Sequence, residues 1–312
     1  MKILIVCSAT NQQIAPFIKE QVENLQSYGE MVDFYFINKK GIDGYIRALP
    51  GLRSKIRKFK PDIIHAHYGL SGLFANLQRK VPVITTFHGS DINDPRVFKW
   101  SKWAIRLSDY SIFVSQKTID LAKIQKQYTL LPCGVDIYCF KPVNKQTARQ
   151  QLGWDTTGTY ILFAGSKEIY VKNYPLAKQA IERIPSAKLI ELKGYRRDEV
   201  NLALNAADVA LMTSFSEGSP QFIKEALACN CPIVSTDVGD VKLLIEEIDG
   251  CFITSFEIGS VVESLQKALN FVSAQGRTEG RNRIEAAELT VKQVTTKLIE
   301  IYKQCIQHDA TN

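Results

Sequence analysis

The stretch DVALMTSFSEGSPQFIKEALACNCPIVSTD, residues 208–237, reads as a strand, a turn, a helix and a second strand. Two β-rich runs, 208–214 and 231–237, flank a segment whose apolar residues Phe222, Ile223 and Leu227 recur at helical spacing. A strand, a helix and a strand at this spacing are typical of connections between parallel strands. The stretch therefore predicts a parallel sheet covered by helices.

The same alternation extends over the whole chain. Further strands are predicted at 2–8, 31–37, 61–68, 81–89, 109–116 and 128–134, and again at 159–166, 187–192 and 250–254. The pattern is interrupted between them by a stretch with Pro and Lys near 135–146, which we interpret as a linker. We therefore expect two Rossmann-like, doubly wound α/β domains, one of residues 1–143 completed by a C-terminal helix at 289–312, the other of residues 144–288. The functional cleft is expected between them, outside the carboxyl ends of the strands.

Composition indicates an ordinary soluble protein. The chain has 312 residues, 45% hydrophobic and 23% charged, which suits two globular cores. The apolar run Ile3 to Cys7 is too short for a signal peptide or a membrane span. Seven cysteines without a disulfide-like or metal-binding spacing indicate a reduced compartment, so we expect a cytoplasmic protein.

Charge is unevenly distributed. Residues 1–150 carry 22 Lys and Arg against 11 Asp and Glu, whereas the remainder is weakly acidic. The segment GLRSKIRKFK, residues 51–60, has an amphipathic, cationic helical pattern. One interpretation is a surface helix whose apolar stripe packs on its own sheet. The other is peripheral docking on the anionic inner face of a membrane. No basic groove interleaved with aromatic residues is evident, so nucleic acid is not an expected partner.

Two glutamates, Glu217 and Glu225, bracket the start of the helix in the first stretch. Ser219 and Pro220 suit the N-cap and N1 positions, and the helix N-terminus that follows a parallel strand attracts anions such as a diphosphate. Gly218 would allow close approach of the backbone. The alternative is that both glutamates are ordinary solvated acids.

The segment SFSEGSPQFIKEALACNCPIVSTDVGD, residues 214–240, resembles the donor-site signature of retaining glycosyltransferases of family 4, which have the GT-B fold. Other segments agree and follow in the family's order, so that the resemblance covers most of the chain: DIIHAHYGLSGLFA (62–75), TTFHGSDI (85–92), LPCGVDIYCFKPV (131–143) and VKNYPLA (171–177).

The resemblance implies roles for individual residues. Glu217 would contact hydroxyls of the transferred sugar, Glu225 would hold the ribose, and Lys172 would neutralise the donor diphosphate. His88, which without the resemblance would be read as structural, would reach the sugar. Catalysis is thus assigned to Glu217, His88 and Lys172. The other implied donor contacts are Gly165, Ser166, Lys167, Gly218, Ser219, Pro220 and Gln221.

The chain departs from the family pattern at three places. Ser166 stands where an arginine is usual, and Lys167 is a candidate replacement. The first loop, residues 8–16, lacks the usual glycine pair. The turn VGDVKLL, residues 238–244, has Asp240 where a second glycine is common and Leu243 where a glutamate often stands. These differences concern the donor and acceptor more than the class of reaction.

The resemblance implies a sugar transfer, with retention, from a nucleotide-sugar donor to a glycan or lipid-linked acceptor in cell-surface polysaccharide or glycolipid synthesis. It implies no cofactor and no metal. His65 and His67 point to the same face of a strand, but a third ligand is not evident. The alternatives are a nucleotide-sugar epimerase or hydrolase of the same fold and a non-catalytic nucleotide-sugar-binding subunit. The sequence does not favour a dehydrogenase, because no GxGxxG follows the first strand.

Overall fold

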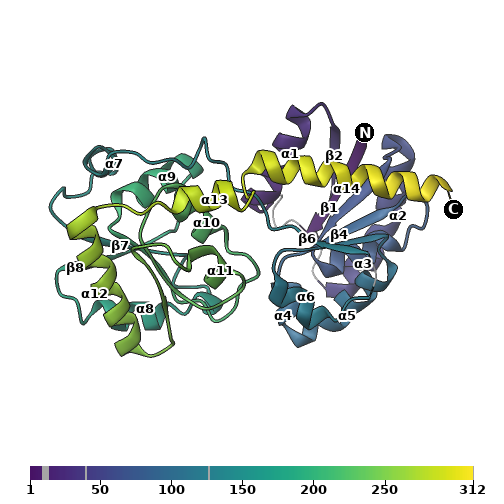
Figure 1. Cartoon of the computed structure of the whole chain (residues 1–312). Coiled ribbons are helices and arrows are strands. Elements are labelled where there is room, and N and C mark those ends of the chain that lie inside the picture. The colour runs from purple at the N-terminus through teal and green to yellow at the C-terminus, as the bar shows by residue number, and fades with distance from the viewer. Residues whose placement is uncertain (9–13, 39–40, 126, 312) are drawn as a thin grey trace. The chain divides into compact units, whose positions relative to one another are not determined.

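A computed structural model describes residues 1–8, 14–38, 41–125 and 127–311 (Figure 1). The chain divides into two compact units: Met1–Gly134 with Val291–Asn312, and Val135–Thr290. Most of the first loop, whose missing glycine pair distinguishes this chain from the family pattern, lies outside the described residues.

The first unit is built on a parallel six-stranded sheet of order β2-β1-β3-β4-β5-β6. Its central strands are continuous apolar runs because helices cover both faces of the sheet. The strands are β1 (Lys2–Ser8), β2 (Met31–Ile37), β3 (Ile63–His67), β4 (Val83–Phe87), β5 (Tyr110–Phe113) and β6 (Tyr128–Leu130). Its helices are α1 (Pro16–Ser27), α2 (Gly41–Phe59), α3 (Gly69–Asn76), α4 (Ser90–Asn93), α5 (Pro95–Leu107), α6 (Gln116–Ala122) and α14 (Val291–Thr311).

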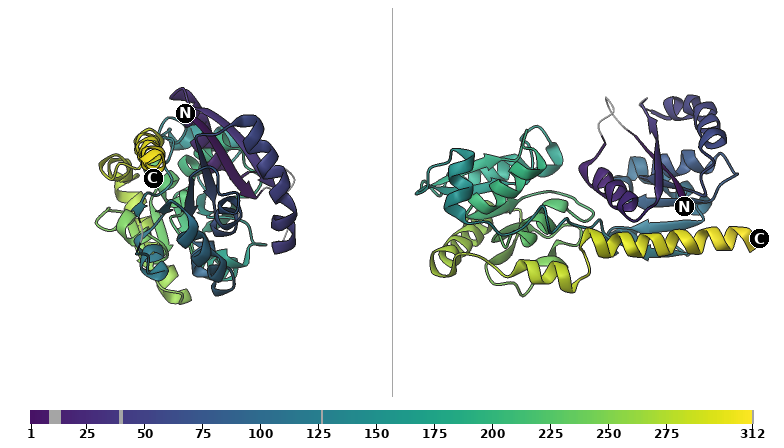
Figure 2. Two further views of the ribbon diagram at one scale, coloured as in Figure 1. Left: turned by 90° about the vertical axis from the view of Figure 1, so that its right-hand side faces the viewer. Right: turned by 90° about the horizontal axis from the view of Figure 1, so that it is seen from above.

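Helix α14 completes the first unit, although it comes from the end of the chain. It runs beside the strands of this unit and next to α1 (Figure 2). Its residues Leu298 and Tyr302 are buried against Ile3, Ile63 and Ile84 of the sheet. This arrangement confirms the prediction that the C-terminal helix returns to the first domain.

Helix α2 contains the basic segment. Its residues Leu52 and Ile56 are buried in a core cluster with residues of β1 and β3, whereas Arg53, Arg57 and Lys58 are exposed. The apolar stripe therefore packs on the protein's own sheet, as the first of the two interpretations expected. Within the described part of the chain, no helix is long and apolar enough to cross a membrane.

The second unit is built on a parallel five-stranded sheet of order β11-β10-β9-β7-β8. The strands are β7 (Thr159–Phe163), β8 (Ala187–Glu191), β9 (Val209–Met212), β10 (Ile233–Thr236) and β11 (Cys251–Thr254). The helices are α7 (Lys145–Leu152), the 3-10 helix η1 (Tyr170–Lys172), α8 (Tyr174–Ile181), α9 (Arg197–Ala206), α10 (Gln221–Ala228), α11 (Val241–Ile245), α12 (Ile258–Gln275) and α13 (Gly280–Ala286). Two doubly wound α/β units are thus confirmed.

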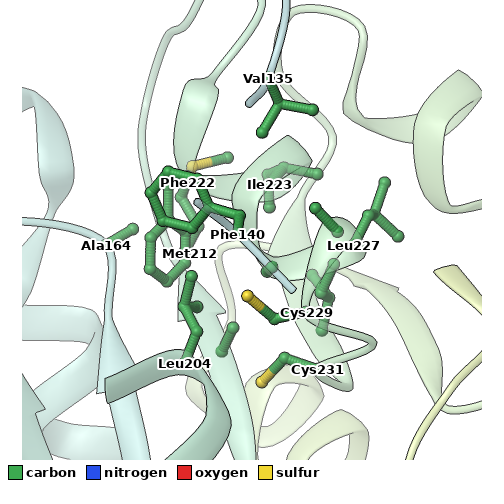
Figure 3. Close-up of a cluster of buried hydrophobic side chains, with 14 of the residues drawn as sticks. Val135, Phe140, Ala164, Leu204, Met212, Phe222, Ile223, Leu227, Cys229 and Cys231 are labelled. Atoms are coloured by element: carbon green, nitrogen blue, oxygen red, sulfur yellow. The ribbon is translucent and has the colours of Figure 1, made fainter. Parts of the chain in front are cut away.

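The junction between the units differs from the expected one at residue 143. Val135 and Phe140 are buried in the core of the second unit, with Met212, Phe222 and neighbouring side chains (Figure 3). The backbone N–H of Val143 donates to the Asn205 side chain at 2.7 Å. Residues 135–143 therefore pack with the second unit rather than the first, because their apolar side chains complete its core.

Candidate functional site

The loops that carry the predicted donor contacts leave the second sheet at its topological switch point. Strand β7 lies between β8, which follows it in the chain, and β9, on its other side. The loops after β7 and β9 therefore diverge, and ligands of open α/β sheets bind where this occurs. Gly165 and Ser166 follow β7, and residues 217–221 follow β9.

Lys172 and Glu217 form an ion pair at this position. Lys172 Nζ lies 2.7 Å from Glu217 Oε1, and the two side chains are 20% and 18% exposed. Thr213, immediately after β9, donates from Oγ1 to the carbonyl oxygens of Lys172 and Asn173 at 3.0 Å. The side-chain hydroxyl thus ties η1 to the end of β9, and this link places the two predicted catalytic residues together.

Gly165 provides the space for the lysine stem. A Cβ at this position would lie 3.1 Å from Lys172 Cγ, so a larger residue would displace the lysine. The neighbouring Ser166 is buried, and its hydroxyl bonds to the Glu168 carboxylate. Lys167 donates from its backbone N–H to Glu191 Oε2 at 2.9 Å, while its side chain is exposed. The loop is therefore organised by acids of its own unit.

Helix α10 begins one residue later than predicted. Pro220, with ψ of 121°, is the N-cap, and Gln221 is the first helical residue. Ser219 precedes the cap, and its hydroxyl accepts from Lys224 Nζ at 3.1 Å. Proline has no side-chain hydrogen-bond acceptor, so the N-cap side chain accepts no hydrogen bond from the backbone N–H groups of the first helical turn. Lys224 is fully buried, which sequence reasoning missed because lysine is usually a surface residue.

A close backbone contact joins the loop after β9 to the loop after β10. Gly239 has a φ of +58°, and a Cβ there would lie 2.2 Å from the carbonyl oxygen of Gly218. Only glycine combines this left-handed conformation with so close an approach. Gly239 therefore holds the loop that contains Glu217 and Gly218.

The second glutamate has a different partner. Glu225 Oε1 lies 2.6 Å from an Arg197 guanidinium nitrogen, and the glutamate side chain is only 5% exposed. The guanidinium also lies 4.5 Å from the centre of the Phe140 ring. Glu217 and Glu225 thus belong to separate ion pairs. They are neither ordinary solvated acids nor a pair of interacting carboxyl groups.

In the first unit, His88 directly follows β4. The buried Asp91 carboxylate accepts the backbone N–H groups of His88 and Gly89 at 3.0 Å and that of Gly69, at the start of α3, at 2.9 Å. Burial raises the pKa of Asp91 to about 6 despite these bonds. Asp91 therefore fixes the turn that presents His88, a role that the sequence did not indicate.

His65 and His67 lie on one face of β3, as predicted, with ring centres 4.4 Å apart. His67 Nδ1 lies 3.0 Å from His88 Nε2. His65 bonds to the hydroxyls of Tyr302 at 2.6 Å and Thr86 at 2.7 Å. Among the described residues, no group of three or more His, Cys, Asp or Glu is arranged to hold a metal ion.

Comparison with known proteins accounts for both units. Residues 6–138 match the model of Glycosyltransferase Family 4, and residues 150–270 match that of Glycosyl transferases group 1. The chain belongs to glycosyltransferase family 4.

Two curated relatives illustrate this membership. The chain is 28% identical, over 61% of its length, to the putative teichuronic acid biosynthesis glycosyltransferase TuaC of Bacillus subtilis, and the match spans 57% of that protein. It is 27% identical, over 75% of its length and 74% of the relative, to an Escherichia coli UDP-Gal:alpha-D-GlcNAc-diphosphoundecaprenol alpha-1,3-galactosyltransferase. The chain thus matches little more than half the length of the first of these relatives.

Solved structures show the fold of this family 4 glycosyltransferase. Sucrose-phosphate synthase of Thermosynechococcus elongatus superposes with a TM-score of 0.87 at 15% identity, covering 99% of this chain and all of that one. Anabaena HepE in complex with UDP gives a TM-score of 0.75 at 15% identity, covering 97% and 100%. The GT-B fold expected from the resemblance is confirmed.

Proposed function

We propose that this family 4 glycosyltransferase moves a sugar, with retention, from a nucleotide diphosphate donor to a glycan or lipid-linked acceptor. The observation that carries the proposal is the Lys172–Glu217 pair at the switch point of the second sheet. In this pair a cation that would bind a phosphate lies next to a carboxylate that would bind a sugar hydroxyl.

The donor would be held by residues of the second unit. The ammonium of Lys172 would turn from Glu217 to the diphosphate, and the N-terminal amides of α10 would bind the same anion. Gly218 has no side chain to obstruct that anion, and Glu217, released from Lys172, would accept hydroxyl hydrogens of the sugar. Glu225 would accept the ribose hydroxyls on the oxygen that does not face Arg197.

Catalysis would consist mainly of positioning and of stabilising the departing diphosphate. In a same-face displacement, the acceptor hydroxyl bonds to the anomeric carbon while the bond to the diphosphate breaks. The hydroxyl proton passes to the leaving diphosphate oxygen. Lys172 lowers the energy of that oxygen's negative charge. His88, on the first unit, is assigned a contact with the sugar.

Two observations support the proposal that the enzyme acts in the synthesis of a cell-surface polysaccharide or glycolipid. The names of the two relatives concern teichuronic acid biosynthesis and a diphosphoundecaprenol-linked acceptor. An acceptor on a lipid diphosphate is anionic, and the first 150 residues carry 22 basic against 11 acidic residues. Peripheral membrane contact through α2 would rest mainly on its cations, since Leu52 and Ile56 of its apolar stripe are buried.

Thermal-shift screening against nucleotides and nucleotide sugars identifies the donor, since a ligand that binds the folded state raises Tm. Transfer is then measured for the native protein, Lys172→Ala and Lys178→Ala. Lys178 is a matched control on the exposed surface of α8, where it pairs with Glu182. We expect loss of transfer only in Lys172→Ala. Unaltered turnover in that variant would refute the assignment, and conversion of the donor without acceptor would indicate an epimerase or hydrolase.

A further inference from the structure

Three of the four histidines of the chain form one stack in the first unit. His67 is fully buried, with its ring between those of His65 and His88 at centre distances of 4.4 and 5.2 Å. The hydrogen bond between His67 Nδ1 and His88 Nε2 is 3.0 Å long. One nitrogen must donate and the other must accept, so this bond couples the proton positions of the two rings.

Either His67 Nδ1 donates to His88 Nε2 or the reverse, and the second ring nitrogen of His67, Nε2, distinguishes these two arrangements. If His88 donated from Nε2, the proton of a neutral His67 would lie on its own Nε2. That atom is buried and has no hydrogen-bond partner among the described residues. Buried N–H groups without an acceptor are rarer than buried acceptors without a donor. The arrangement in which His67 Nδ1–H donates to His88 Nε2 is therefore favoured.

We propose that His67 is a positioning residue that fixes the proton of His88 on Nδ1 and keeps His88 neutral. A protonated His88 would carry N–H on both nitrogens and would force the His67 proton onto the unpartnered Nε2. His67 does not relieve this conflict by taking a second proton, because burial lowers its pKa to about 3. His88 should therefore resist protonation near neutral pH.

Other titratable groups face His88 from the surrounding elements. Cys133 Sγ lies 3.9 Å from His88 Nδ1, and the Tyr68 ring centre lies 4.6 Å from that of His88. Asp91, from α4, is directed at backbone amides, and Glu20 of α1 lines a small hollow with Cys133. Burial raises the pKa of Tyr68, so its hydroxyl stays neutral.

The result is a neutral Nδ1–H donor on the side of the ring away from His67. This donor lies 3.9 Å from Cys133 Sγ, and a hydroxyl or phosphate oxygen of a ligand that replaced the thiol as acceptor would meet an N–H without a positive charge. Its use toward the sugar rests on the proposed function, whereas the position of the proton does not.

Long-range proton–nitrogen NMR of protein labelled with 15N-histidine shows which ring nitrogen carries the proton and so tests the proposal directly. The substitution His308→Gln removes the signals of the one histidine outside the stack. We expect His88 to show a protonated Nδ1 and an unprotonated Nε2 from about pH 8 to about pH 6, without the titration near 6.5 of a free imidazole. A proton on Nε2, or ordinary titration in the native protein, would overturn the proposal.

Two variants isolate the contribution of His67. His67→Phe keeps a planar ring and removes the donor, so His88 should titrate near 6.5 and lose its preference for Nδ1. Cys133→Ala is the matched control at the opposite nitrogen and should keep the native pattern. An unchanged His88 in His67→Phe would refute the role of His67. An inactive native protein with the His88 proton on Nδ1 would contradict the proposed function and support this inference.

Discussion

Lys172 Nζ lies 2.7 Å from Glu217 Oε1, and this ion pair occupies the position where the donor diphosphate is expected. In this arrangement the ammonium of Lys172 and the carboxylate of Glu217 neutralise each other. In the proposed function a donor phosphate would compete with the Glu217 carboxylate for the ammonium of Lys172. The proposed function therefore predicts that the pair connects the affinity for the diphosphate with the contact to the sugar.

Glu217→Gln tests this connection. The substitution keeps the shape but removes the charge, so Lys172 no longer has to leave a carboxylate in order to bind phosphate. We expect binding of the nucleoside diphosphate, measured by calorimetry, to be unchanged or tighter. Turnover should fall at least about tenfold because the sugar contact is weakened. Glu182→Gln, at the exposed C-cap of α8, is the control. Weaker nucleotide binding in Glu217→Gln would contradict the scheme.

Arg197→Met should destabilise the second unit and weaken donor binding. Removal of one partner leaves the Glu225 carboxylate buried and unneutralised, and breaking such a pair costs about 3–5 kcal/mol when both partners are buried. Because Arg197 is 32% exposed, we expect roughly 1–3 kcal/mol in urea unfolding.

Arg196→Met is the matched control for this prediction. Arg196 precedes Arg197 in the chain, is 73% exposed and pairs with Asp198 at the surface. Its loss should cost less than about 1 kcal/mol. Equal effects of the two substitutions would show that burial of Glu225 is not the cause.

Gly239→Ala should disturb the loop after β9. The added Cβ would collide with the carbonyl oxygen of Gly218, 2.2 Å away, in addition to the cost of a positive φ. Gly194→Ala, with φ of +81° and nothing within 4 Å of the added Cβ, isolates the backbone cost, which is about 1 kcal/mol. We expect a larger loss of stability, and weaker nucleotide binding, in Gly239→Ala alone. Equal losses would exclude the loop contact as the cause.

The first unit should lose stability in acid through its buried histidines. Burial lowers the pKa of His67 to about 3 and that of His65 well below its ordinary value. As the pH falls below about 6.5, the unfolded chain binds protons that the folded state cannot, so stability present above that pH is lost toward pH 3. Each histidine contributes a slope of about 1.4 kcal/mol per pH unit.

Asp91 has the opposite effect on the stability of the first unit, over a narrower range of pH. Its raised pKa of about 6 means that the folded state binds the proton first, which adds stability as the pH falls from about 6 to about 4. Urea unfolding at several pH values should still show net acid destabilisation, because two histidines outweigh one carboxyl group. The slope should be smaller in His67→Phe, and an identical slope in that variant would contradict the assignment to His67.

The fold was accessible from the sequence because strands buried on both faces must be apolar throughout. The runs predicted at 2–8 and 31–37 coincide with β1 and β2, and the other predicted runs contain the remaining strands. The junction was misplaced because a stretch with Pro and Lys resembles a linker. The packing of Val135 and Phe140 depends on a core assembled from distant segments.

The alternation of strands and helices, the resemblance to the family and the loops on which donor contacts are expected could all be predicted from the sequence. These properties are local, since they follow from apolar periodicity and from motifs of adjacent residues. The pairings of side chains required the folded structure: Lys172 with Glu217, 45 residues apart, Arg197 with Glu225, 28 apart, and His67 with His88, 21 apart. The charge of these side chains and the positions of their protons depend on which groups the order of strands in the sheet brings together. The distance between two residues along the chain does not specify that order.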